Sequence, residues 1–192
     1  TWSEIFSPSG WPTKVALPLW LLLIEVIGLA AWPLANVLLG RLSDGGYLPA
    51  KALGLLLLGY LSWLLAATKV ASYTRWTILG MLLLLLVLGG AVGWARRKEL
   101  LELWRTRRKL LLLEEGLFLA GFLLFLLIRF GNPDLWHNWF GGEKPMDLAY
   151  LTAIVRSTTF PPYDPWHAGG YLNYYYFGWV LLAAPIKLTG IV

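Results

Sequence analysis

The sequence predicts an all-α integral membrane protein, a polytopic helical bundle of about five transmembrane helices with an amphipathic surface helix in an outer loop. Hydrophobic residues make up 58% of the 192 residues and charged residues only 14%, and the mean hydropathy is +0.61. These values lie outside the range of ordinary soluble domains. The leucine-rich runs also match the length, about 20 residues, that a helix needs to cross about 30 Å of hydrocarbon.

Glycine, proline and charged residues separate the apolar runs, which is how membrane helices are punctuated. The runs predict an N-terminal membrane part over 1–129 with helices at 15–39, 52–67, 78–95 and 110–128, an outer loop over 130–173, and a fifth span over 174–192. The second run is short, so we expect neighbouring helices to embed it or Lys51 and Thr68 to extend it. A hairpin that does not cross the membrane is the alternative. Because the chain starts at Thr1 and stops at Val192 inside an apolar run, we expect it to be a portion of a longer protein.

Basic residues between the third and fourth runs predict the orientation. The segment 96–109 contains only two acidic residues, Glu99 and Glu102, against Arg96, Arg97, Lys98, Arg105, Arg107, Arg108 and Lys109. Such a short positive loop is typical of the cytoplasmic side, so the N-terminus and the 130–173 loop are predicted to lie outside a multi-pass plasma membrane protein. The predicted partners of this segment are anionic head groups of the lipid bilayer, and no nucleic acid.

One carboxylate, Glu25, lies near the middle of the first apolar run. An ionised carboxylate is costly there, so we expect an interhelical hydrogen bond, with a proton or ion pathway as the alternative. Glu114 and Glu115 follow the basic segment and are expected to pair with it. The chain has no cysteine, which excludes disulfides and thiolate metal sites.

The outer loop contains a predicted surface helix over residues 145–157. Pro145 suits the first helical position, and Asp147 falls in the first turn. Apolar side chains then recur at helical spacing, which predicts an amphipathic helix lying on the membrane. They are Leu148, Leu151, Ile154 and Val155. The helix is expected to end before Phe160, because the residue preceding a proline avoids the helical conformation.

Two carboxylates in this loop form the predicted functional pair. The helix dipole holds Asp147 ionised and ready to accept hydrogen bonds, and prolines stiffen the chain around Asp164. The alternative is that Asp147 only caps its helix. No protein-only metal site has suitable spacing, so the cofactor stays unknown, with a divalent cation between a carboxylate and a substrate phosphate as the open option. Nucleophilic serine or cysteine sites, Walker loops and dinucleotide fingerprints are absent from the sequence.

Several distinctive motifs lie between residues 128 and 178. They are Ile128-Arg129-Phe130, Asn132-Pro133-Asp134-Leu135-Trp136, Gly142-Glu143-Lys144-Pro145-Met146-Asp147, Pro161-Pro162-Tyr163-Asp164-Pro165-Trp166 and Gly170-Tyr171-Leu172-Asn173-Tyr174-Tyr175-Tyr176-Phe177-Gly178. Together these motifs closely resemble the YYY family of large bacterial and archaeal membrane proteins. The layout of that family is similar to the GT-C glycosyltransferases, which use polyprenyl-phosphate sugars. The resemblance implies that Asp147 is the catalytic acidic residue, that Glu143 is the nearest second acid, and that Pro161-Pro162 forms the turn into the next span.

The leading hypothesis is therefore a GT-C-like membrane glycosyltransferase that takes a polyprenyl-phosphate-linked sugar at the extracytoplasmic face. Asp147 and Glu143 are the predicted catalytic residues. The predicted substrate-binding residues supply charge for phosphate or flat surfaces for sugar and prenyl groups; they are Lys144, Arg156, Asp164, Trp166, Asn173, Tyr174, Tyr175 and Tyr176. The alternative is a non-catalytic accessory subunit that binds other membrane subunits, and a transporter, based on Glu25 alone, is the third reading.

Overall fold

The computed structural model describes residues 10–132 and 144–191. Their helices are α2 (Trp11–Lys14), α3 (Ala16–Leu39), α4 (Tyr47–Ala67), α5 (Arg75–Ala95), α6 (Arg97–Gly131), α7 (Lys144–Arg156) and α8 (Phe177–Thr189). The described residues contain no strand, only an isolated antiparallel bridge between Tyr163 and Tyr171. The predicted all-α fold is confirmed.

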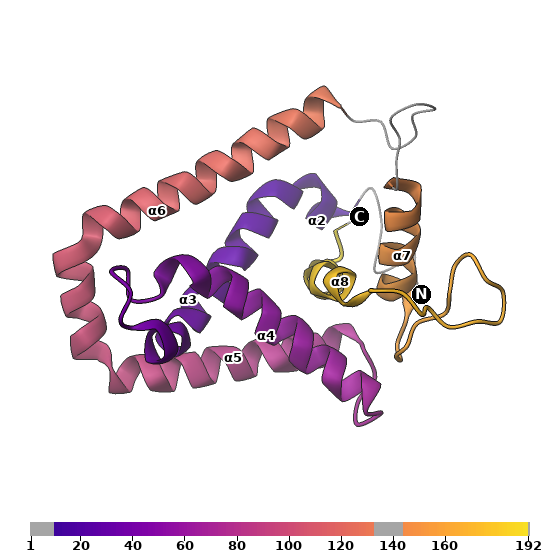
Figure 1. The fold of residues 1–192 in the computed structure, drawn as a ribbon, viewed down its shortest axis with the longest axis horizontal. Helices are drawn as coiled ribbons and strands as arrows, with labels where there is room; N and C mark the ends of the chain where they lie inside the picture. The colour runs from indigo at the N-terminus through magenta and orange to yellow at the C-terminus, as the bar shows by residue number, and fades with distance from the viewer. Residues whose placement is uncertain (1–9, 133–143, 192) are drawn as a thin grey trace.

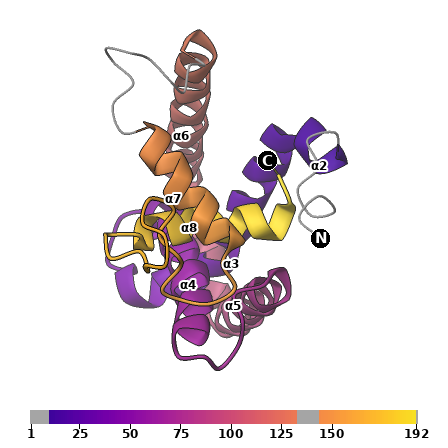
Figure 2. The ribbon, with the colours of Figure 1, turned by 90° about the vertical axis from the view of Figure 1, so that its right-hand side faces the viewer.

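Four helices, α3 to α6, are long and apolar enough to cross a membrane. With 21 residues, α4 meets that criterion, so the second apolar run is not too short to span. The fifth apolar run contains the shorter helix α8, whose 13 residues extend only about 20 Å at 1.5 Å per residue. Figures 1 and 2 show α8 crossing the direction of α4 and α5 instead of running along them. A fifth span over 174–192 stays a prediction.

A tight turn explains why α4 begins at Tyr47, five residues before the predicted start of the second apolar run. Gly45 and Gly46 adopt left-handed backbone angles, with φ of 61° and 80°, which glycine reaches without steric cost. The buried Asp44 carboxylate accepts hydrogen bonds from the backbone N–H groups of Gly46 (3.1 Å) and Leu48 (2.8 Å). These bonds satisfy donors that the first helical turn leaves unpaired, so the helix starts there.

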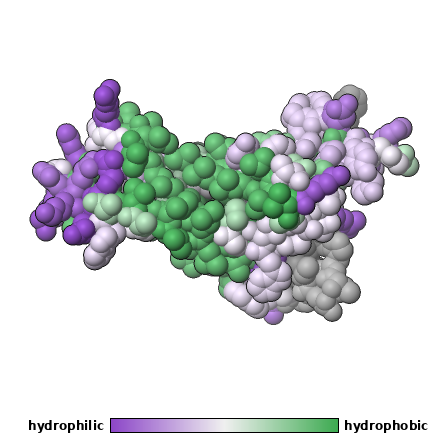
Figure 3. All heavy atoms as spheres, turned by 90° about the horizontal axis from the view of Figure 1, so that it is seen from below, coloured by the Kyte–Doolittle hydropathy of each residue, from purple (hydrophilic) through white to green (hydrophobic). Residues whose placement is uncertain are grey.

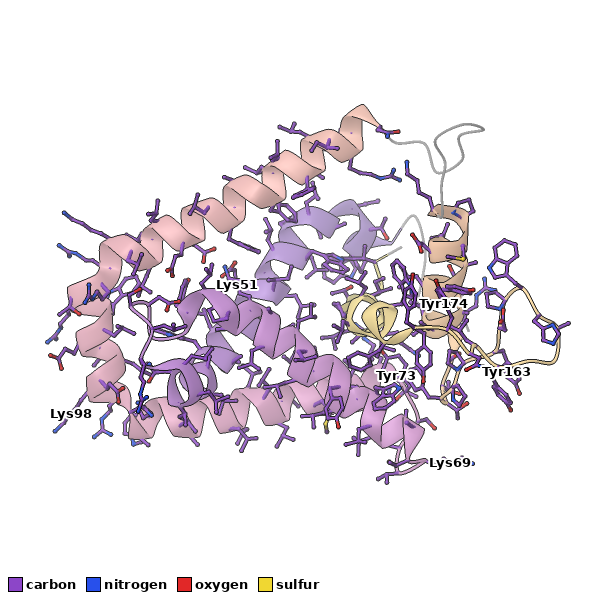
Figure 4. The ribbon with its side chains drawn as sticks, viewed as in Figure 1. Lys51, Lys69, Tyr73, Lys98, Tyr163 and Tyr174 are labelled. Carbon is purple, nitrogen blue, oxygen red and sulfur yellow. The ribbon has the colours of Figure 1, made fainter. Side chains whose placement is uncertain are left out.

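The bundle has two distinct ends. The basic end carries the turn between α3 and α4 and the start of α6, and Figure 1 shows that α6 first lies across this end and then returns along the bundle. The hydrophilic residues at one extreme of Figure 3 belong to this end, where Figure 4 also labels Lys98. At the opposite end, which we call the loop end, lie the turn between α4 and α5, α7 and the proline-rich segment. The helices α3 to α5 therefore run between these two ends.

The core combines α3, α4, α5, α7 and α8. Small residues allow the helices to approach closely, as is usual in membrane proteins. A Cβ atom on Gly54 would lie 2.6 Å from Ile27 Cγ2, and one on Gly89 would collide with the carbonyl oxygen of Ala30. By contrast, Leu111 is the only buried residue of α6. Most of the apolar surface of α6 therefore faces outward.

Candidate functional site

The helix α7 lies at the loop end and packs on α8 (Figures 1 and 2). Its bounds, Lys144–Arg156, agree within one residue with the predicted helix, and Asp147 lies in its first turn as predicted. Of its apolar stripe, Ile154 and Val155 are buried in the protein core, while Leu148 is 45% exposed. The C-terminal half of the stripe thus packs against protein, and the position of α7 on the membrane surface stays a prediction.

The proline-rich segment after α7 folds into a closed loop. Phe160–Pro161 is a cis peptide, and backbone hydrogen bonds join Leu172 N to Pro162 O (2.8 Å) and Asp164 N to Gly170 O (3.0 Å). One carboxylate oxygen of Asp164 accepts bonds from the backbone N–H groups of Trp166 (2.8 Å) and His167 (3.2 Å), an Asx-type turn. Asp164 therefore holds its own loop, and its second oxygen has no such bond within the described chain.

A cavity of about 700 Å³ separates α7 from this loop, and we call it the α7 groove. Its walls include an arginine, a carboxylate and several hydroxyls as well as apolar groups. Among the lining residues are Thr152, Arg156, Ser157, Thr158, Pro161 and Asp164. The volume lies within the range of about 300–1,000 Å³ that is usual for ligand sites.

The groove brings together two of the predicted site residues, Arg156 and Asp164, but Asp147 does not line it. Residues four and seven positions after Asp147 are Leu151 and Ile154, which face the core, so the half-buried Asp147 lies on the core side of α7. Asp147 lies in the first turn of α7, where a carboxylate also interacts favourably with the helix dipole, so the capping alternative stays open. Glu143 lies outside the described residues.

The tyrosine triplet is divided between two environments. Tyr174 contacts Tyr150 of α7, with ring centroids 6.1 Å apart, and the 69% exposed Tyr175 lies against Tyr174 with ring centroids 3.9 Å apart. Tyr176 stacks on the buried Phe160 at 5.8 Å, and its hydroxyl accepts a hydrogen bond from Trp63 Nε1 (3.3 Å). Tyr176 thus holds the loop on α4, while its two neighbours stay near the surface.

The remaining aromatic and polar site predictions lie on the outside of the loop. Trp166 is 63% exposed, and Asn173 is exposed as well. Tyr163 stacks on Tyr171 at 5.1 Å, and their hydrogen bond raises the pKa of Tyr163. Figure 4 shows Tyr163 and Tyr174 on separate parts of the loop end. None of the triplet tyrosines is among the residues that line the α7 groove.

Lys187, which the sequence analysis did not single out, anchors the site. Its buried ammonium donates to the carbonyl oxygens of Tyr73 and Ser157 (2.7 Å for the latter) and lies 4.5 Å from the Tyr73 ring centroid. Tyr73 also bonds from its N–H to Thr158 O (2.7 Å) and from its hydroxyl to Val180 O (3.2 Å). The sequence did contain a signal for this role, because a lysine within an apolar run needs polar partners in the folded protein. This anchor joins the α4–α5 turn, the end of α7 and α8.

A second cluster, near the basic end, involves Glu25. Lys51 Nζ lies 2.8 Å from a Glu25 oxygen and 2.6 Å from a Glu115 oxygen, and the Tyr47 hydroxyl donates to Glu115 (2.8 Å). Glu25 thus has the expected interhelical partner, which is Lys51 of α4, and the two residues form an ion pair. The expectation that Glu115 pairs with the basic segment is wrong, because α6 turns back along the bundle and brings Glu115 against α4 (Figure 4 labels Lys51).

Comparison with known proteins gives one family. A family model described as "Uncharacterized membrane protein (DUF2298)" matches residues 57–192, which include α5 to α8, the C-terminal half of α4 and the loop-end site. No curated protein and no solved structure matches the chain. In the described residues, no group of three or more His, Cys, Asp or Glu could hold a metal ion. Because the match covers well over half of the sequence, the chain belongs to the DUF2298 family of uncharacterized membrane proteins.

Proposed function

We propose that this membrane protein is a glycosyltransferase of the GT-C type, which transfers a sugar from a polyprenyl phosphate at the extracytoplasmic face. The observation that carries the proposal is the α7 groove, a cavity of about 700 Å³ beside a helix with a carboxylate in its first turn. Its hydroxyls and Asp164 suit a polyhydroxylated ligand, and Arg156 suits an anionic one. The resemblance of the 128–178 motifs adds the reaction class.

Distance along α7 divides the proposed roles. Asp147 and Arg156 are nine residues apart, or about 14 Å at 1.5 Å per residue, so they cannot both touch the reacting carbon and its phosphate. Lys144 precedes Asp147 by three residues and is thus on the neighbouring turn. We therefore assign the donor phosphate to Lys144, and the acceptor to the Arg156 and Asp164 end of the groove.

In the proposed reaction, an acceptor hydroxyl attacks the anomeric carbon of the donor sugar. A new carbon–oxygen bond forms, the bond from that carbon to the phosphate oxygen breaks, and the hydroxyl proton passes to Asp147 as general base. Glu143 is the proposed second acid. Asp147 lies on the core side of α7 and does not line the groove, so we place the reacting carbon at the first turn of α7, beyond the end of the groove at Pro145.

The test is Asp147→Asn in the full-length protein, which keeps the side-chain shape and removes the charge. Transfer from a radiolabelled polyprenyl-phosphate sugar should fall by about 10²–10⁴-fold if Asp147 is the base. Glu102→Gln, on the exposed basic part of α6, is the control that should leave transfer unchanged. Unchanged turnover in a folded Asp147→Asn protein removes the catalytic role.

A non-catalytic subunit of a larger assembly is the second candidate, because α6 exposes a large apolar surface that includes Leu117, Leu124 and Phe125. Purification with stable membrane partners, together with no transfer from any lipid-linked sugar, would favour this function over the enzyme.

A further inference from the structure

An apolar groove runs along α6 inside the membrane-spanning part, bordered by α3 in both of its cavities and by α4 as well in the smaller one. Two cavities of about 330 Å³ and 620 Å³ form it, and both are lined by Ile24 of α3 and Phe118 of α6. The smaller lies at the Lys51 cluster, and the larger continues toward the loop end between Trp20 and Phe122. We call the two together the α3–α6 groove.

The chemistry of the walls selects a hydrocarbon ligand. Every residue that lines the larger cavity is apolar, and aromatic rings supply much of its surface. The groove belongs to helices that are long enough to span a membrane, and its surroundings there are lipid chains. A polar ligand would lose its hydrogen bonds to water without gaining others, whereas an acyl chain loses none.

Charge gives the ligand a direction. At the end of the groove near the Lys51 cluster, Lys51 already pairs with Glu25 and Glu115. Two carboxylates thus face one cation there, and they repel a phosphate. At the loop end, Arg129 follows Phe125 and Leu126 on the same face of α6, four and three residues later. Its guanidinium donates one bond to Asn132 O (3.0 Å) and has further donors in its fork.

We propose that the α3–α6 groove binds one acyl chain of an anionic bilayer phospholipid, with the phosphate at Arg129 and the chain end at the Lys51 cluster. This lipid site is independent of the proposed glycosyl transfer. The lipid would fill the space that separates α6 from α3 and fix the position of α6, which contributes only Leu111 to the buried residues.

Two glycines of α6 provide a matched pair for the test. A Cβ atom at Gly121, which lines the groove, or at the exposed Gly116, which does not, meets no other atom within 4 Å. Gly121→Leu therefore adds apolar volume to the groove from a position whose Cβ meets no other atom, and Gly116→Leu adds the same side chain outside it. Both substitutions also favour the helix.

The experiment uses the full-length protein in phosphatidylcholine nanodiscs with phosphatidylglycerol that carries a diazirine on one acyl chain. Light should crosslink this probe to α6 peptides around Phe118 and Phe122 in the wild type and in Gly116→Leu. Labelling should fall about tenfold or more in Gly121→Leu. Equal labelling of the two leucine variants would overturn the proposal.

The head group has its own test. Arg129→Gln should lower the preference for phosphatidylglycerol over phosphatidylcholine by about fivefold, the factor expected for one basic residue at a membrane surface, while Arg105→Gln at the basic end should not. An unchanged preference in Arg129→Gln would contradict the proposed orientation. Displacement of the probe by polyprenyl phosphate but not by unlabelled phosphatidylglycerol would show a different occupant and overturn the proposal.

Discussion

Individual carboxylates and lysines of this chain take roles that their local sequence does not reveal. Asp164 uses one oxygen for the turn of its own loop, whereas Asp147 has no bond to the described residues and stays the better candidate base. Asp164 also acts on a residue of α7. Burial raises the pKa of Tyr150, and the nearby Asp164 and Tyr174 raise it further. Two similar carboxylates are thus separated into a structural and a candidate catalytic residue.

Lys187 carries the prediction at the residue scale. Lys187→Met removes a buried ammonium and leaves the carbonyl oxygens of Tyr73 and Ser157 without that donor. Because buried unsatisfied groups are costly, the protein should lose about 1–3 kcal/mol of unfolding free energy. Thermal unfolding in detergent measures the loss. Lys69→Met, at an exposed lysine of the α4–α5 turn, is the control, and equal shifts in both proteins would contradict the anchor.

At the scale of elements, close contact between α3 and α5 depends on glycine. A side chain at Gly89 would meet the backbone carbonyl of Ala30, which cannot move without shifting α3, whereas Gly90 faces open space. The helix α6 is attached differently, because an ion-pair cluster and few packed side chains hold it to α4. The bundle therefore has a tightly packed part and a loosely attached helix.

Gly89 and Gly90 give the prediction for this scale. Gly89→Ala should destabilise the protein by about 1–3 kcal/mol, the usual cost of overpacking. Gly90→Ala should be neutral or slightly stabilising, because alanine favours the helix and nothing lies within 4 Å of its Cβ. Denaturant titration of helix content compares the two variants. A Gly89→Ala protein as stable as Gly90→Ala would mean that α3 and α5 can separate freely.

For the whole molecule, the basic end and the loop end define two faces on opposite sides of the predicted membrane. Hydrophilic residues gather at the basic end (Figure 3), and the α7 groove lies at the loop end. Because positive residues favour the cytoplasmic side, the groove should be extracytoplasmic. Sidedness therefore decides which compartment supplies the acceptor.

Single cysteines in this cysteine-free chain test the sidedness. In intact cells, an impermeant maleimide should label Thr159→Cys at the loop end and should label Arg107→Cys only after permeabilisation. Both positions are exposed, so access depends on the side of the membrane and not on burial. The reverse pattern would place the groove in the cytoplasm and remove the extracytoplasmic donor from the proposal.

The sequence alone determined the features that depend on local pattern. Apolar length located the four helices that can span a membrane, but α6 begins at Arg97, so the basic segment predicted as a loop over 96–109 is helical. Pro145 with the following apolar stripe located α7 and placed Asp147 in its first turn. These predictions from local pattern succeed because helix formation and membrane insertion depend on neighbouring residues within a few turns. The left-handed glycine turn that starts α4 early is also local, but its cap comes from a residue outside the apolar run.

Only the tertiary structure decided which side chains meet. Lys51 and Glu115 are 64 residues apart in sequence, and Lys187 and Tyr73 are 114 apart. The same holds for the side of α7 on which Asp147 lies and for the division of the tyrosine triplet, since both depend on how α7 and the loop dock on α4 and α8. Hydrophobic periodicity fixes a helix and its apolar side, but the packing of distant helices fixes the partner of each polar group.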